Sequence, residues 1–373
     1  MGSLVYFADL RCRNHNESLP AKVTKLCQAA GLDEWVSEND LVAVKLHFGE
    51  KGNASYIRPI LVRPVIDLVR EKGGKPFLTD TNTLYMGTRW NAASHIECAI
   101  TNGFAYAVTN APVVIADGLK GRSRVAVPIP GGKRLEEAHV ASGIVESDGM
   151  LVLSHLKGHE LTGFGGALKN VAMGCASRLG KLHMHSQVHP EVKQDRCVGC
   201  KECVKVCPVT AAVLQEPSGK VFIDQETCIG CGDCIVACRF GAIAVDWNEA
   251  SSSVQEKIAE YCAGVLQHGL LEKSGFMTFV MNVSPYCDCY GYNDQGIVPD
   301  IGIIASRDPI AIDQAAVDLV NRQPGIRESE LQNNLEPGED KFKGLFPHID
   351  WGIQLERAEE LGLGSRKYEL VDI

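Results

Sequence analysis

Two closely spaced runs of cysteines constrain this 373-residue chain more than any other feature of its sequence. The first run comprises Cys197, Cys200, Cys203 and Cys207, and the second comprises Cys228, Cys231, Cys234 and Cys238. Both runs follow the pattern C-x2-C-x2-C-x3-C. The first three thiolates of such a run can surround one face of a metal cluster, whereas the following helical turn carries the fourth thiolate away. Each run is therefore expected to give three ligands to one cluster and one ligand to a second cluster.

This ligand spacing is that of bacterial ferredoxin modules with two 4Fe–4S clusters. The predicted ligand sets are Cys197, Cys200, Cys203 and Cys238 for the first cluster, and Cys228, Cys231, Cys234 and Cys207 for the second. Pro208 follows Cys207, as is usual for the motif, whereas Arg239 follows Cys238. Paired zinc ribbons are the alternative, but they use two close knuckles separated by a longer loop. The sequence therefore predicts two iron–sulfur clusters.

Composition excludes several other classes of protein. The formal net charge of −9 and the lack of basic clusters argue against nucleic-acid binding. No apolar run approaches the ~20 residues of a membrane-spanning helix, and the first residues do not resemble a signal peptide. The 15 cysteines include the eight cluster candidates, and most of the others are expected to be buried thiols. We expect a cytoplasmic protein of an anaerobic or microaerobic organism, because oxygen damages such clusters.

Strand and helix patterns alternate on both sides of the cysteine runs, which predicts an α/β core with a parallel or mixed sheet. Strands are predicted at 41–48, 75–80, 113–116, 149–154, 276–283 and 300–306. Helices are predicted at 58–72, 91–101, 167–174, 256–271 and 309–322, the last capped by Asp308. The core would be discontinuous, comprising residues 1–189 and 247–373. The ferredoxin-like module, residues 190–246, would be inserted into it.

A polar, glycine-rich segment follows the predicted strand 149–154 and contains the main catalytic candidates. These are His155, Lys157, His159, Lys169 and Asn170. Ligands of open α/β sheets gather at the carboxyl ends of strands, so the location suits a site. The lysines, the histidines and free backbone amides before the helix could bind a small anionic substrate through a carboxylate or phosphate. The alternative is a solvated loop whose glycines only permit a turn.

The segment Cys287-Asp288-Cys289 follows the predicted strand 276–283 and forms a second candidate site. Two thiolates are too few for a structural zinc site, so an extra metal ion would also need histidines, such as His47, His155 or His159. A redox-active thiol pair and simple packing are the alternatives. The remaining polar candidates are ordinary loop, cap or linker residues unless they converge in space: Asp80, Asp313, His183, His185 and His189.

The polar motifs on both sides of the cysteine runs resemble those of the family known as domain of unknown function 362. The resemblance covers about 42–320 and implies an α/β core with an inserted pair of 4Fe–4S clusters. It does not imply a substrate. The family's polar motifs map onto Lys157, His159, Lys169, Asn170, Cys287, Asp288, Cys289, Asp308 and Asp313.

Two functions follow from these patterns. In the first, a redox enzyme, the clusters exchange single electrons with a core site built from the Lys/His loop and the Cys-Asp-Cys segment. In the second, the protein has no chemistry of its own and serves in electron transfer or metalloprotein assembly, docked to a partner oxidoreductase. A third reading treats the clusters as structural elements or oxygen sensors. The first two require a redox partner protein. The sequence contains no recognisable flavin or nicotinamide fingerprint, and it indicates neither the substrate nor the oligomeric state.

Overall fold

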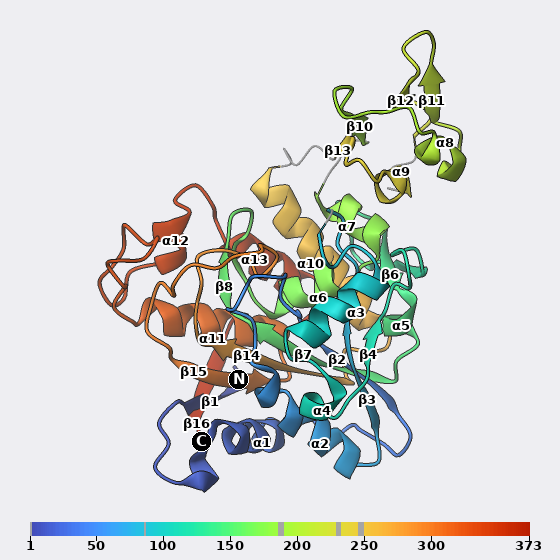
Figure 1. The fold of residues 1–373 in the computed structure, drawn as a ribbon. Coiled ribbons are helices and arrows are strands. Elements are labelled where there is room, and N and C mark those ends of the chain that lie inside the picture. The colour runs from blue at the N-terminus through green and yellow to red at the C-terminus, as the bar shows by residue number, and fades with distance from the viewer. Residues whose placement is uncertain (1, 86, 186–189, 229–232, 245–249) are drawn as a thin grey trace.

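The computed structural model describes residues 2–85, 87–185, 190–228, 233–244 and 250–373. Its centre is an eight-stranded sheet in the order β16-β1-β15-β14-β7-β2-β3-β4 (Figure 1). The strands are β16 (Tyr368–Asp372), β1 (Ser3–Asp9), β15 (Gly302–Ser306), β14 (Ser274–Val280), β7 (Gly149–His155), β2 (Leu41–Lys45), β3 (Lys75–Asp80) and β4 (Val113–Ile115).

The sheet is mixed, with β15 as its one antiparallel strand in the described chain. Neighbouring strands from β14 to β4 run parallel, with Val152 of β7 opposite Phe276 of β14. The β15 strand pairs antiparallel with both β14 and β1, and β1 pairs parallel with β16. The predicted α/β core with a parallel or mixed sheet is therefore confirmed. The carboxyl ends of five adjacent strands meet at one edge, where ligands of such sheets gather.

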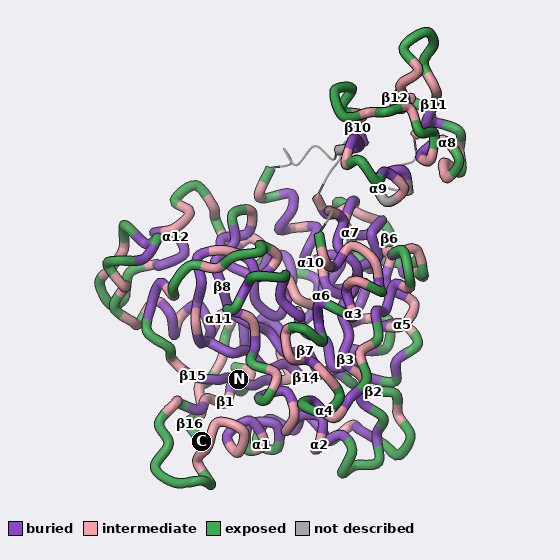
Figure 2. Tube along the Cα trace, viewed as in Figure 1, coloured by how far each residue is buried: buried purple, intermediate pink, exposed green. Residues whose placement is uncertain are grey.

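Helices cover both faces of the sheet, and β7 shows why. Met150 and Val152 face one layer, whereas Leu151 and Leu153 face the other, as the two-residue period of a strand requires. The first layer contains α6 (Ala167–Cys175), α10 (Ser251–Gln267), α11 (Pro309–Asn321) and α13 (Gly352–Glu360). The second contains α1 (Leu19–Ala29), α2 (Arg63–Glu71) and α3 (Ala92–Thr101). Both faces of β7 and β14 are buried, so their sequences are almost continuously apolar. Figure 2 draws much of the interior of the α/β body in purple, the colour of buried residues.

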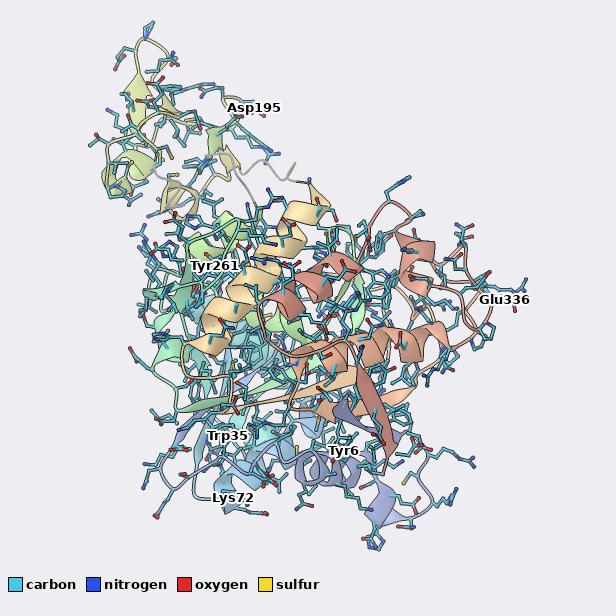
Figure 3. All side chains as sticks on the ribbon, turned by 180° about the vertical axis from the view of Figure 1, so that it is seen from behind. Tyr6, Trp35, Lys72, Asp195, Tyr261 and Glu336 are labelled. Atoms are coloured by element: carbon cyan, nitrogen blue, oxygen red, sulfur yellow. The ribbon has the colours of Figure 1, made fainter. Side chains whose placement is uncertain are left out.

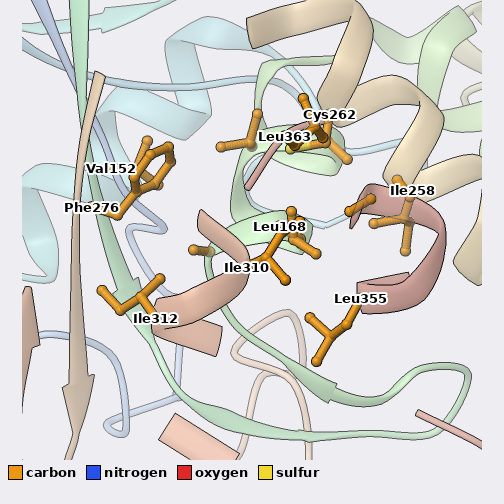
Figure 4. Close-up of a cluster of buried hydrophobic side chains, with 14 of the residues drawn as sticks. Val152, Leu168, Ile258, Cys262, Phe276, Ile310, Ile312, Leu355 and Leu363 are labelled. Carbon is orange, nitrogen blue, oxygen red and sulfur yellow. The ribbon is translucent and has the colours of Figure 1, made fainter. Parts of the chain in front are cut away.

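The larger core lies between the sheet and the first layer of helices. Figure 3 shows α10, which carries the buried Tyr261, on this side of the molecule. In Figure 4, Val152 and Phe276 of the sheet are drawn with Leu168 of α6 and Ile310 of α11 in the same apolar cluster. This packing holds α6 against the strands, and α6 carries two of the catalytic candidates.

Short elements complete the α/β body. They are the hairpins β5 (Arg124–Pro128) with β6 (Glu137–Ala141) and β8 (Lys157–His159) with β9 (Gly163–Gly165), the helices α4 (Tyr106–Thr109), α5 (Ser142–Val145), α7 (Arg178–His185) and α12 (Lys341–Leu345), and 3-10 turns at His15–Glu17 and Pro59–Leu61. The segment predicted as a loop after β7 thus contains the β8–β9 hairpin, since Gly163 has a φ of +74° that permits the reversal. No helix within the described residues has both the length and the apolar character needed to cross a membrane.

The cysteine-rich segment repeats one β-α-β unit. Its elements are β10 (Glu191–Val192), α8 (Glu202–Val206), β11 (Ala212–Gln215), β12 (Lys220–Ile223), α9 (Asp233–Ala237) and β13 (Ile243–Ala244). The outer strands β10 and β13 pair antiparallel, and so do β11 and β12. The segment has its own apolar cluster, which includes Val221 and Ile223, and Figure 1 draws it outside the layers of the α/β body.

Candidate active site

A cavity of about 900 Å³ lies at the carboxyl edge of the sheet. Residues from the ends of β2 and β3, the β8–β9 hairpin, α6, α7 and the segment after β14 line its wall. The predicted candidates among them are Lys157, His159, Lys169, Asn170, Cys287 and Cys289, together with His47, Asp80 and His185. The Lys/His loop and the Cys-Asp-Cys segment, which the redox-enzyme hypothesis combines in one core site, thus line one cavity.

His155 is the catalytic candidate that does not line this cavity. It is buried, and its Nδ1 lies 3.0 Å from both carboxylate oxygens of Asp288. Its Nε2 lies 3.1 Å from the carbonyl oxygen of Met281 and 3.0 Å from that of Asn282. Carboxylate and carbonyl oxygens only accept hydrogen bonds, so each ring nitrogen of His155 lies beside acceptors alone. His155 thus supports the site from beneath.

Asp288 is the buried centre of this support. Its carboxylate also accepts a hydrogen bond from Ser55 Oγ at 3.0 Å and lies 3.3 Å from Nζ of Lys157. Burial alone would raise the pKa of Asp288, but the charges of His155 and Lys157 outweigh it and hold the pKa well below its usual range. Asp288 is therefore ionised and faces away from the cavity.

A tight turn brings the two cysteines beside Asp288 together. The amide of Tyr290 donates to the carbonyl oxygen of Cys287 at 3.1 Å, which closes a four-residue turn. The sulfur atoms of Cys287 and Cys289 are 3.0 Å apart. Nζ of Lys169 lies 3.7 Å from Sγ of Cys287, and Nε2 of His47 lies 3.5 Å from Sγ of Cys289. Both sulfurs thus lie beside a nitrogen donor.

These contacts shift the pKa values of the two thiols in opposite directions. Contact with Cys287 and with His47 lowers the pKa of Cys289 well below its ordinary value, despite burial. Contact with Cys289 and burial raise the pKa of Cys287. The pair therefore holds one thiolate, on Cys289, hydrogen-bonded to one thiol.

Two of the histidines that line the cavity, His47 and His159, present N–H donors to it. The amide of Gly49 donates to Nδ1 of His47 at 3.0 Å, and the amide of Leu161 donates to Nδ1 of His159 at 3.2 Å. Burial lowers the pKa of both rings, so each is neutral with its proton on Nε2. A metal ion needs a nitrogen lone pair instead. Among the described residues, no group of three or more His, Cys, Asp or Glu side chains is arranged to hold a metal ion.

Buried ion pairs form the floor of the cavity. Nζ of Lys45 lies 3.1 Å from the Asp80 carboxylate and donates to Oδ1 of Asn170 at 2.7 Å. Arg89 lies 3.2 Å from Glu50 and 3.7 Å from Asp80. Lys45, Arg89 and Glu50 were not predicted as site residues from the sequence. A lysine within the apolar run 41–48 was an available signal for Lys45, whereas Arg89 and Glu50 lie in irregular segments with no pattern.

The cavity is basic although the protein is acidic. Six basic side chains line it, namely Lys45, Lys51, Arg89, Lys157, Lys169 and Lys181, against three acidic ones, Glu50, Asp80 and Glu160. Nζ of Lys181 donates to the carbonyl oxygen of Ala176 at 2.9 Å, and burial lowers the pKa of Lys181 to about 8. The arrangement therefore suits an anion.

The histidines that precede the first cysteine run do not all line the cavity. His185 lines the cavity, where burial lowers its pKa to about 3. His183 instead packs against the ring of His139, with ring centroids 5.0 Å apart. His189 lies outside the described residues.

The start of α6 differs from the prediction. The amides of Ala167 and Leu168 are not free, because they donate to the buried carboxylate of Asp313 at 2.6 and 3.0 Å. Burial raises the pKa of Asp313 to about 7. A Cβ on Gly166 would lie 2.2 Å from Oδ1 of Asp313, so the close approach requires glycine. Asp308 caps α11 as predicted, through the amides of Ile310 and Ala311, and does not line the cavity.

The first predicted set of cluster ligands lies together. Cys197, Cys200, Cys203 and Cys238 line one small cavity. Backbone amides donate to three cysteine sulfurs: Val221 to Cys197 at 3.4 Å, Ala242 to Cys238 at 3.2 Å and Ala211 to Cys207 at 3.2 Å. Such hydrogen bonds stabilise cluster thiolates, so these residues fit a 4Fe–4S cluster. Of the second set, Cys231 lies outside the described residues. None of the described cysteines forms a disulfide.

The fold and the site define an α/β protein with a basic, thiol-containing cavity and an inserted cysteine-rich segment. Residues 42–318 match the family described as Domain of unknown function (DUF362), and the chain belongs to this family. The resemblance stated from the sequence motifs is therefore confirmed.

Two solved structures are similar to this chain at low identity. One is the lactate racemase apoprotein from Thermoanaerobacterium thermosaccharolyticum, with 12% identity and a TM-score of 0.39 over 75% of this chain. The other is a protein from Thermotoga maritima, with 11% identity and a TM-score of 0.39 over 92% of this chain. The matches span 51% and 59% of those two proteins. No curated protein matches the chain.

Proposed function

We propose that this protein is an iron–sulfur redox protein in which two 4Fe–4S clusters exchange electrons with the basic cavity of the α/β core. One observation carries the proposal: Cys238, from the second run, lies in the same small cavity as Cys197, Cys200 and Cys203 of the first run. This exchange of the fourth ligand is what distinguishes a two-cluster ferredoxin module from two independent metal knuckles. The module would comprise residues 190–246, and the core residues 1–189 and 247–373.

A contact between the module and the core supports electron exchange with the cavity. Ile235 of α9 packs against the buried side chains of Leu84 and Leu182. Leu84 lines the cavity, and Ile235 follows Cys234, a ligand of the second proposed cluster. The second cluster would therefore be the one nearer the cavity. The first cluster would exchange electrons with a redox partner protein, in a compartment that keeps thiols reduced.

The cavity residues have distinct proposed roles toward a small anionic substrate. Lys169 and Lys181 would bind its negative charge, because the Lys45, Lys157 and Arg89 cations already face carboxylates. His159 would donate its Nε2 proton to the substrate. Asn170, which bonds Lys45 and the carbonyl oxygen of Leu153, and His155, through Asp288, would position these groups. When bound, the clusters supply single electrons at potentials within roughly −700 to +450 mV.

Metal analysis of anaerobically purified protein tests this function. We expect about eight irons and eight acid-labile sulfides per chain, four for each 4Fe–4S cluster. A Cys203→Ser variant should lose roughly half the iron and the electron paramagnetic resonance signal of one reduced cluster. A Cys12→Ser variant is the matched control, because Cys12 is exposed and far from both runs in the sequence. Zinc without iron would overturn the proposal. Full clusters in a protein whose cavity binds no anion would favour the non-catalytic electron-transfer alternative.

A further inference from the structure

Cys287 and Cys289 have a geometry that goes beyond binding. We propose that they form a redox-active dithiol, which closes to an intramolecular disulfide and passes two electrons at a time to an anionic acceptor in the cavity. This inference deepens the proposed function and rests on it for the source of electrons.

The turn holds the two sulfurs close to bonding distance. They are 3.0 Å apart, and a disulfide needs about 2.05 Å, so side-chain rotation of roughly 1 Å closes the bond. Asp288 between them is fixed on three sides, so the backbone of the turn is held in place. Its carboxylate bonds His155 and Ser55, and its carbonyl oxygen accepts the amide of Glu50 at 3.1 Å.

The surroundings of the sulfurs suit thiol chemistry better than a metal ion. Nε2 of His47 and Nζ of Lys169 each present an N–H donor to one sulfur, which stabilises negative charge on either. The same two groups would oppose a cation, since the His47 proton occupies the lone pair that a metal would use and Lys169 repels positive charge. Within the described residues, no group of three or more His, Cys, Asp or Glu side chains around the pair could hold a metal ion.

The step balances as an ordinary thiol–disulfide exchange. Starting from the Cys289 thiolate and the Cys287 thiol, closing the S–S bond passes two electrons to the acceptor and releases one proton, and reopening it takes up two electrons and one proton. With glutathione disulfide as an anionic acceptor, Cys289 attacks one sulfur and releases one glutathione thiolate. Cys287, after losing its proton to solvent, attacks the mixed disulfide and releases the second. The bond is reopened by two electrons, which the two clusters of the proposed function deliver one at a time, or by a small dithiol in vitro.

The sequence makes the test direct, because trypsin releases both cysteines in one peptide, residues 274–307, that contains no other cysteine. Protein purified anaerobically is equilibrated with glutathione disulfide or with a small dithiol, quenched in acid, alkylated and digested. We expect peptide 274–307 to carry two labels after the dithiol. After glutathione disulfide, the peptide should carry no label, and its mass should be two hydrogens lower than that of the unlabelled reduced peptide.

Variants separate the dithiol from chance oxidation. Cys289→Ser should leave one thiol that accepts at most a mixed disulfide, whereas the Cys12→Ser control should close the bond as the wild type does. Lys169→Met should slow the reaction with glutathione disulfide by about tenfold, because attraction of the anion is lost. The reaction of this variant with an uncharged disulfide should be slowed by a smaller factor than its reaction with glutathione disulfide.

The outcomes distinguish the two proposals. Two labels on the peptide in every buffer would overturn the dithiol, and so would a bound metal ion that Cys289→Ser releases. Full clusters with a pair that never closes would refute this inference and leave the proposed function standing. If Cys287 and Cys289 form the disulfide in a protein that contains no iron, the proposed function would be refuted and the dithiol would stand.

Discussion

The carboxylate of Asp288 lies 3.0 Å from Nδ1 of His155, and both side chains are buried below the cavity. Asp288 thus points away from the cavity, although the cysteines on either side of it line that cavity. Because its charge balances His155 and Lys157, it fixes both the Cys-Asp-Cys turn and one wall of the cavity. The pair is therefore the structural anchor of the site.

Removing this charge should destabilise the protein strongly. Asp288→Asn leaves the buried Lys157 cation without its carboxylate, which typically costs roughly 3–5 kcal/mol. We expect that loss in the free energy of unfolding measured by urea titration. Asp294→Asn is the control, since Asp294 is exposed in the same segment and its loss should stay within about 0.5 kcal/mol. Equal stability of the two variants would contradict the anchoring role.

Asp313 should give the protein an unusual dependence on pH. Burial raises its pKa from 3.8 to about 7 in the folded state, so folding favours the protonated form. Its contribution to stability is then fully present below about pH 4 and is lost as the pH rises through about 7. Asp313→Asn lacks this titration. Between pH 4 and pH 7.5, we expect urea unfolding of the variant to gain roughly 3–4 kcal/mol relative to wild type. Parallel stability profiles would rule this out.

Gly166 should tolerate no side chain. A Cβ there would lie 2.2 Å from Oδ1 of Asp313, which the amides of Ala167 and Leu168 hold in place. Gly166→Ala should therefore cost about 1–3 kcal/mol and lower the thermal midpoint. Gly352→Ala is the matched control, because its nearest neighbour, Oδ1 of Asp350, would be 3.3 Å away. A midpoint shift in the control as large as in Gly166→Ala would show that the clash is not the cause.

Anion binding in the cavity should weaken in alkali. Burial lowers the pKa of Lys181 to about 8, so this side chain loses its charge as the pH rises past that value. Sulfate is a suitable probe, since its charge does not change in this range. By calorimetry, we expect weaker binding at pH 9 than at pH 7, and in Lys181→Met weak binding at both. Lys133→Met, which removes an exposed lysine paired with Glu360, should behave as wild type. Sulfate affinity that is the same at both pH values would exclude Lys181 as a ligand.

The elements of the core could be predicted from the sequence because their signals are local. The continuous apolar run in 149–154 and the cap at Asp308 depend only on neighbours along the chain, and they match β7 and α11. The β8–β9 hairpin was missed, since three-residue strands are too short to show a period. The chain's membership of its family was likewise visible in its motifs.

The candidate site depended on contacts between distant parts of the chain. Lys45 bonds Asn170, 125 residues away, and Asp313 occupies the amides of α6 from 145 residues away. No pattern within one segment predicts such contacts, because they arise only when strands and helices pack. The sequence predicted anion-binding amides at α6, whereas tertiary packing had already given them a carboxylate.

The sequence by itself determined the spacing of the eight cysteines proposed as cluster ligands, because the cysteines within each run are close together along the chain. It also marked Cys287-Asp288-Cys289 as unusual. Only the tertiary structure decided that these cysteines share a cavity with Lys169 and His159, and that Asp288 and His155 lie beneath it. The physical reason is that the local sequence determines where a strand ends and which residue stands there. Which side chains that residue contacts depends on how all the strands and helices pack together.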